Sequence, residues 1–281
     1  MRFNGGAALP WSRVERILSG RPGPTPVPVD HVPDATDTPK VGHSAVPFAE
    51  LHAVSSYSFL RGASEPEELV ARAVELGMQG MALVDRDGFY GLMKFAEAAA
   101  KVGLPAVFGA ELSLEPAPLT VLARTPEGYR RLSRLISRAR MEAGEKDAVR
   151  YPPLAEIAAD LQDECLFLVG WEWAEHFDLL LERIKIDSMV LEYSCTQTPE
   201  DSDRHALLDS CPVPRAIATA RPAAATRDRA RLAGAKQALS RRLALADASP
   251  NTHPMGAPWL RSGDQLSLIH ISEPTRQAEI S

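Results

Sequence analysis

The stretch ELHAVSSYSFLRGASEPEELVARAVELGMQGMALVD, residues 50–85, decides the fold class. ELHAV has the length and apolar character of a strand, and EPEELVARAVELG is typical of a helix with Ser64 as N-cap and Gly77 as C-terminal stop. GMALVD is then a second apolar strand. A strand, a helix and a strand in this order predict a parallel βαβ unit.

The same alternation continues along the chain. Further strands are expected in PAVFGAELSL, LTVLAR, ECLFLVG, SMVLEYS and PRAIATA, with helices between most of them. EPAP, the link between the third and fourth strands, is too short for a helical crossover, so these two should form a hairpin. Seven strands alternating with helices predict a mostly parallel α/β fold, either a barrel or a doubly wound sheet.

Composition excludes several classes of protein. No run approaches the roughly twenty apolar residues of a membrane helix, and the N-terminus lacks the pattern of a signal peptide. Three widely spaced cysteines favour buried thiols in a reducing cytoplasm over a disulfide framework. A net charge of −6 argues against a main role in gripping phosphate backbones, so the basic stretches at 124–140 and 227–242 are interpreted as solvated helix faces.

The residues that could carry out catalysis or bind metal lie where the predicted strands end. His52, Asp85, Asp87 and Glu111 offer an imidazole and carboxylates that can converge on divalent ions and activate water for phosphoester hydrolysis. Glu192 also falls near a strand end. The alternative is a structural histidine with acids that cap helices, Asp87 capping the helix after DRDG.

Several longer blocks carry a family resemblance. Residues 50–114, the block LARTPEGYRRLSRLIS and the segments VPRAIATA and ARLAGAKQAL resemble the PHP (polymerase and histidinol phosphatase) domain of bacterial C-family DNA polymerases, most closely the error-prone, damage-inducible branch. The resemblance implies a PHP-type distorted seven-stranded β/α barrel. It also implies that the palm aspartates, which hold Mg²⁺ in the parent polymerase, lie beyond this chain.

The resemblance also sets the domain boundaries. Residues 1–46 are expected to form a short helix and a proline-rich extended linker, 47–246 the PHP domain, and 247–265 an exit segment toward the palm. Residues 266–281 contain LSLIHISEPTR, which resembles a translated sequencing adapter, and they are expected to lie outside the fold.

The metal site that the family implies is depleted in this sequence. Intact members resemble HxHSxYSxLDGAS and TDHDG; here His52 and Glu111 match ligand positions, while the degenerate positions hold Val54, Arg61, Arg86 and Ala223. Two ligands would hold Zn²⁺ or Mn²⁺ weakly. We therefore expect no catalytic residue and no tightly bound cofactor in this chain.

The two arginines suggest what replaced the ions. The hypothesis is that Arg61 and Arg86 pair with Asp85, Asp87 or Glu111, because an unpaired buried carboxylate is costly. The alternative is that both arginines point into solvent.

The leading interpretation is the scaffolding N-terminal part of a cytoplasmic error-prone DNA polymerase that copies past lesions. It would work with DNA, dNTPs and, in the parent, a sliding clamp and lesion-bypass accessory proteins. The alternatives are a stand-alone PHP metal phosphoesterase or 3′–5′ exonuclease, and a non-catalytic interaction module.

Overall fold

The structure is a computed structural model that describes residues 41–145, 148–196, 198–244, 253 and 257–271. The helix and most of the linker expected within residues 1–46 lie outside the described residues, as do parts of the exit segment and residues 272–281.

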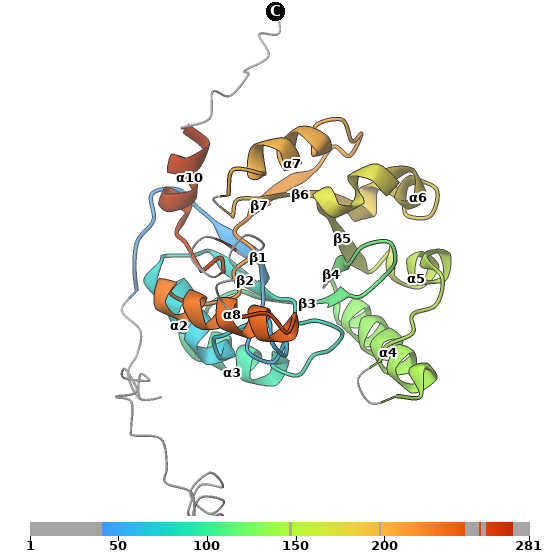
Figure 1. The fold of residues 1–281 in the computed structure, drawn as a ribbon, viewed down its shortest axis with the longest axis horizontal. Helices are drawn as coiled ribbons and strands as arrows, with labels where there is room; N and C mark the ends of the chain where they lie inside the picture. The colour runs from blue at the N-terminus through green and yellow to red at the C-terminus, as the bar shows by residue number, and fades with distance from the viewer. Residues whose placement is uncertain (1–40, 146–147, 197, 245–252, 254–256, 272–281) are drawn as a thin grey trace, which may run out of the picture. The chain divides into compact units, whose positions relative to one another are not determined.

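A single seven-stranded sheet curls into a nearly closed barrel at the centre of the described domain (Figure 1). The strands follow one another in chain order: β1 (Ala49–Ala53), β2 (Gly80–Leu83), β3 (Ala106–Leu112), β4 (Leu119–Ala123), β5 (Cys165–Val169), β6 (Met189–Ser194) and β7 (Ala216–Thr219). This confirms the predicted α/β class and resolves the open choice in favour of the barrel.

One strand runs against the others. β4 pairs antiparallel with both β3 and β5, whereas the remaining neighbours pair parallel. The hairpin expected from the short EPAP link is therefore confirmed. Because β4 is reversed, the start of β4 lies at the same end of the barrel as the carboxyl ends of the other strands.

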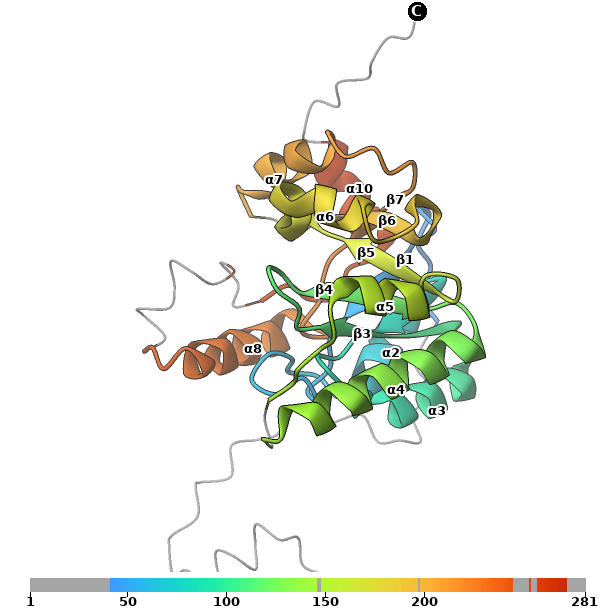
Figure 2. The same cartoon turned by 90° about the vertical axis from the view of Figure 1, so that its right-hand side faces the viewer.

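Helices surround the barrel on its outside (Figures 1 and 2). They are α2 (Pro66–Glu75), α3 (Leu92–Val102), α4 (Pro126–Ala143), α5 (Leu154–Leu161), α6 (Phe177–Leu181), α7 (Asp201–Leu208), α8 (Arg227–Ser240) and α10 (Gly263–Ile271), with 3₁₀ turns η1 (Trp171–His176) and η2 (Ile186–Ser188). Across the described residues, no helix combines the length and apolar character that a membrane crossing requires.

Two kinds of apolar core follow from the alternation of side chains along each strand. A small cluster inside the barrel includes Val84, Leu122, Leu168 and Val190. Larger clusters fill the layer between the strands and the surrounding helices.

The seam between the first and last strands is closed by a carboxylate. Glu50 is fully buried, and its two oxygens accept hydrogen bonds from the backbone N–H groups of His52 (2.8 Å) and Ala220 (2.8 Å). The backbone N–H of Val54 also donates to the carbonyl of Pro222 at 3.0 Å. Glu50 thus connects β1 to the end of β7 where the register of β1 shifts.

The predicted helix caps are partly right. Thr125 caps α4 by accepting a hydrogen bond from the backbone of Gly128, and Gly77 takes a left-handed φ of 67° after α2. Ser64 is not the N-cap of α2: Glu65 is, in a capping box with Glu68.

The side chain of Ser64 instead accepts a hydrogen bond from the backbone of Ala225, 2.9 Å away. Asp87 does not cap α3, whose N-cap is Gly91. A positive φ of 49° turns Asp87 toward β3 instead.

The C-terminal segment differs from the expectation at one point. α10 runs through Ile271, and Leu266 is buried against Cys195 and Ala220. Residues 266–271 therefore continue a helix of the described domain. Whether residues 266–281 are foreign to the protein stays a prediction.

Candidate functional site: a pocket of paired charges

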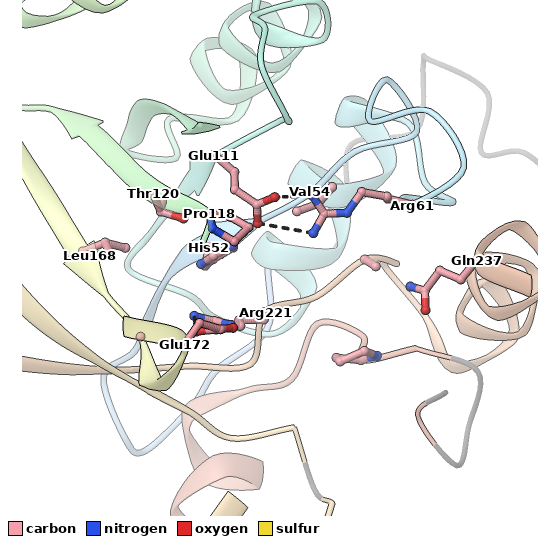
Figure 3. A pocket seen from close by; sticks show the side chains of 13 residues that line it. His52, Val54, Arg61, Glu111, Pro118, Thr120, Leu168, Glu172, Arg221 and Gln237 are labelled. Atoms are coloured by element: carbon pink, nitrogen blue, oxygen red, sulfur yellow. Dashed lines mark hydrogen bonds and ion pairs between the residues drawn. The ribbon is translucent and has the colours of Figure 1, made fainter. Parts of the chain in front are cut away.

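A pocket of about 210 Å³ opens where the strands of the barrel end (Figure 3). Its walls come from elements far apart in the sequence, because the carboxyl ends of the parallel strands and the start of the reversed β4 lie at the same rim. The lining residues are His52, Val54, Arg61, Glu111, Pro118, Thr120, Leu168, Gly170, Glu172, Arg221, Ala223, Gln237 and Pro258.

His52 lies between two carboxylates. Its Nδ1 donates to Oε1 of Glu192 on β6 at 2.8 Å, and its Nε2 lies 3.7 Å from Oε2 of Glu111 at the end of β3. The same Glu192 oxygen accepts a hydrogen bond from Thr219 Oγ1 at 2.6 Å. Both edges of the imidazole are therefore committed to acids.

Arg61 closes over Glu111 from the loop that follows β1 (Figure 3). Both terminal nitrogens of its guanidinium donate to the carboxylate, so that each Glu111 oxygen accepts one hydrogen bond. This is one of the pairings that the ion-pair hypothesis expected, and it removes the alternative in which Arg61 points into solvent.

Arg221 joins two further carboxylates. Its guanidinium contacts Glu192 Oε2 at 2.6 Å and forms a two-nitrogen contact with Glu172 in η1. A Cβ at Gly170 would collide with both groups of the Arg221–Glu172 pair. The absence of a side chain at position 170 is thus what admits this ion pair.

Charges in this pocket set one another's ionisation. Burial alone would lower the pKa of His52, but the charge of Glu192 and the contacts with both acids raise it to about 9. Burial alone would raise the pKa of Glu192 and of Glu111. The charge of Arg221 holds the pKa of Glu192 well below its usual range, and contacts with His52 and Arg61 do so for Glu111.

The charges in the pocket therefore balance at neutral pH. Three cations (His52, Arg61 and Arg221) face three carboxylates (Glu111, Glu172 and Glu192).

The degenerate ligand positions fall into two groups. Val54 and Ala223 line the pocket, and their small apolar side chains offer no ligand atom. Arg86 lies beside the pocket: its Nε donates to Ser113 Oγ at 2.6 Å and lies 3.7 Å from Asp87 and 4.0 Å from Glu111.

Of the two aspartates expected as charge partners, Asp87 pairs with Arg86, and both aspartates also hold loops together through hydrogen bonds. Asp85 accepts hydrogen bonds from the backbone and hydroxyl of Ser55 and from the hydroxyl of Ser58, at 2.7–2.9 Å. Burial raises its pKa despite these bonds.

Asp87 accepts from the backbone and hydroxyl of Ser113 and from the hydroxyl of Tyr151. Asp85 and Asp87 thus fasten loops together and do not line the pocket.

The residues present do not fit a metal ion. Both oxygens of Glu111 already accept hydrogen bonds from Arg61, and the Nδ1 of His52 donates to Glu192. Across the described residues, no three His, Cys, Asp or Glu side chains are arranged to hold an ion. A divalent cation at Glu111 would also have to approach the positive guanidinium of Arg61.

Sequence reasoning missed the strongest part of the network. Glu172 and Arg221 were not among the candidate residues, and Glu192 was noted only for its place near a strand end. A signal was available for Arg221, because it lies two residues after the end of β7 and two residues before Ala223. Glu172 had none, because WEWAEHF resembles an ordinary core segment.

Comparisons with known proteins identify the family of this domain. A model of the PHP domain matches residues 50–192. The chain is 48% identical over 280 residues to the error-prone DNA polymerase of Corynebacterium glutamicum, covering 96% of this chain and 26% of that protein.

Two further relatives carry the same name. The error-prone DNA polymerase of Corynebacterium diphtheriae is 51% identical over 268 residues, covering 93% of this chain and 26% of that protein. That of Mycobacterium tuberculosis H37Rv is 38% identical over 299 residues, covering 92% and 27%. The chain spans about a quarter of the length of the curated relatives it matches.

Among solved structures, an amidohydrolase from Chromobacterium violaceum with bound sulfate and no metal aligns with a TM-score of 0.37 and 16% identity, covering 57% of this chain and 81% of that one. That likeness is too weak to bear on function. The match of a family model to residues 50–192, together with the seven-stranded barrel, shows that the chain belongs to the PHP domain family.

Proposed function

We propose that this chain is the N-terminal PHP module of a cytoplasmic error-prone DNA polymerase, and that the module serves as a metal-free scaffold. The observation that carries the scaffold role is the contact of Arg61 with both oxygens of Glu111. The names of the relatives and the quarter of their length that the chain matches support the polymerase parent.

The pocket stabilises the rim of the barrel instead of binding substrate. His52 links β1 to β6 through Glu192, Arg61 links the first loop to β3, and Arg221 links the end of β7 to η1. Each ion pair joins elements that are distant in sequence. The network therefore holds the strand ends in place without a metal.

In the parent, we expect the chemistry to belong to the palm. Mg²⁺ held there by aspartates would activate the primer hydroxyl toward a dNTP, including opposite a damaged template base. DNA, a sliding clamp and lesion-bypass accessory proteins would be partners of that longer polypeptide.

The test compares this chain with the longer polypeptide encoded by the same gene. We expect the longer polypeptide to extend a primer with Mg²⁺, also across an abasic site, and this chain alone to extend none. A reading frame that ends within this chain, or a longer product without primer extension, would contradict the polymerase proposal.

The competing function is a metal-dependent phosphoesterase or 3′–5′ exonuclease, because His52 and Glu111 remain at ligand positions of the family. Incubation of this chain with a labelled single strand and with p-nitrophenyl phosphate, in Mn²⁺ or Zn²⁺, separates the two. We expect no hydrolysis above the rate of a Glu111→Gln control. Activity that this control abolishes would favour the hydrolase.

A further inference from the structure

α8 carries an apolar stripe on the side that faces away from the barrel. Leu232, Ala235 and Leu239 follow one another at spacings of three and four residues, which places them on one helix face, and Leu243 lies just beyond the end of the helix at Ser240. The leucines are exposed by 42%, 64% and 41% in chain order. Such a row of leucines is what a helix normally buries.

The opposite face of α8 already has its partner. Ala230 and Ala233 pack with Ala63 and Ala224 in one buried cluster. Two polar contacts tie the helix down as well: Lys236 Nζ donates to the carbonyl of Gly62 at 2.9 Å, and Arg229 contacts Glu68 at 2.6 Å. Figure 2 shows α8 at the edge of the domain, away from α4, α5 and α6. The helix that carries the stripe is therefore fixed to the domain by its opposite face.

Basic residues flank the stripe on both sides. The segment 227–243 holds six of them (Arg227, Arg229, Arg231, Lys236, Arg241 and Arg242) and one acid, Asp228, a formal charge of +5 within a chain of net charge −6. At 100° per residue, Arg231 lies on one side of the leucines of α8, and Arg229 and Lys236 on the other, while Arg242 lies just past the end of the helix. Arg231 and Arg242 are exposed and pair with no residue in the described part of the chain.

We propose that the outer face of α8 docks an acidic amphipathic helix from the part of the longer polypeptide that this chain does not include. An apolar row favours a helix that packs its own leucines against it, and the basic flanks favour carboxylates on that helix. The source follows from length: the relatives are about four times longer than the segment they share with this chain. The inference rests on the proposed function.

Other occupants fit less well. The α8 of a second copy would bring basic flanks against basic flanks, and like charges repel. A nucleic acid strand would find no aromatic side chain on α8 on which to stack its bases.

The experiment measures whether the stripe is covered in the longer polypeptide. Leu239→Cys is introduced in a Cys211→Ser background, because Cys165 and Cys195 are buried. The rate of maleimide labelling is then compared between this chain and the longer polypeptide. Met141→Cys, on α4 and 82% exposed, is the matched control.

We expect Leu239→Cys to label at least tenfold more slowly in the longer polypeptide, with no change at Met141→Cys. The double substitution Arg231→Glu and Arg242→Glu should restore fast labelling, because it repels an acidic helix. Both polypeptides carry the same α8, so circular dichroism of this chain checks that the substitutions leave the fold intact.

Three outcomes overturn the proposal. Equal labelling in both polypeptides means that no intrachain segment covers α8. Protection of this chain that increases with its concentration means that a second copy is the occupant. Protection that survives the charge reversal means that the occupant is not acidic. If primer extension is present while labelling is equal, only this inference fails and the proposed function stands.

Discussion

Glu50 and Glu192 are two fully buried glutamates whose pKa values move in opposite directions. Burial raises the pKa of Glu50 to about 7, because its only strong partners are two backbone N–H groups. Glu192 is as deeply buried, but Arg221 and His52 hold its pKa well below the usual range. The nearby countercharge, and not burial, decides whether a buried acid stays ionised.

Arg221 and Arg261 differ in the same way, since only Arg221 contacts a carboxylate in the described part of the chain. The guanidinium of Arg221 contacts two carboxylates, which raise its pKa even though burial would lower it. Arg261 is 2% exposed, stacks on Trp259 with 4.3 Å to the ring centroid, and has no hydrogen-bond acceptor among the described residues. Burial lowers the pKa of Arg261 to about 10. The pocket is thus a region of matched charges, and Glu50 and Arg261 are unmatched.

The largest loss of stability is expected from the substitution Arg221→Met. This substitution leaves Glu172 without its cation and removes one of the two cations at Glu192, so we expect a loss of about 3–5 kcal/mol in the free energy of unfolding. Urea denaturation measures it. Arg221→Lys, which keeps the charge but not the paired geometry, should lose less; an equal loss from both would contradict the role of the countercharge.

The pH dependence of the free energy of unfolding should report the raised pKa of Glu50 directly. Its folded pKa of about 7 lies above its ordinary value of 4.5, so the folded chain holds the proton more tightly. The contribution of protonated Glu50 to the free energy of unfolding is therefore fully present below pH 4.5. It falls by about 3 kcal/mol as the pH rises through 7.

Glu50→Gln keeps one acceptor at the seam and should flatten the slope between pH 4.5 and 7. His52, with a pKa raised from 6.5 to about 9, gives a separate fall in stability between those two pH values. Urea titrations at several pH values distinguish the two windows. An unchanged slope in the variant would show that Glu50 is ionised in the folded state.

A smaller loss is expected from Arg61→Met. The side chain of Arg61 is 35% exposed, so water screens its interaction with Glu111. We expect about 1–2 kcal/mol of destabilisation. Lys101→Met, which breaks a surface pair with Glu97 whose side chains are 68% and 70% exposed, is the control and should leave the free energy of unfolding almost unchanged.

The smallest effect, with the opposite sign, is expected from Arg261→Met. Replacing a buried cation that has no acceptor among the described residues by an apolar chain of similar length should leave the protein equally stable or up to about 1 kcal/mol more stable. A loss above about 2 kcal/mol in urea would show that Arg261 has a partner and would end the contrast with Arg221.

Sequence patterns were sufficient for the strands and helices, the family resemblance added the barrel, and neither predicted most of its charge contacts. Alternation of apolar strands and helices predicts seven strands, and the four-residue EPAP link predicts the reversed β4, because both depend on local sequence. The family pattern also led to the hypothesis that Arg61 pairs with Asp85, Asp87 or Glu111, and the structure shows that its partner is Glu111.

Long-range contacts were beyond such reasoning. Glu50 meets the backbone of Ala220, 170 residues away, and only the closure of the barrel brings them together. Glu172 likewise meets Arg221 across 49 residues. The cap at Glu65 was missed by one position, because Ser64 is the favoured N-cap residue type, whereas in the structure its hydroxyl accepts a hydrogen bond from Ala225 and Glu65 takes the cap position.

Guanidinium and imidazolium groups stand in this pocket where intact members of the family would bind metal ions. Isothermal titration calorimetry of this chain with Zn²⁺ and Mn²⁺ tests this replacement of the ions most directly. A variant with Val54→His, Arg61→Asp, Arg86→His and Ala223→His restores the family pattern and serves as the positive control. We expect the unmodified chain to bind neither ion stoichiometrically while the variant gains binding; one tightly bound ion per unmodified chain would contradict the account.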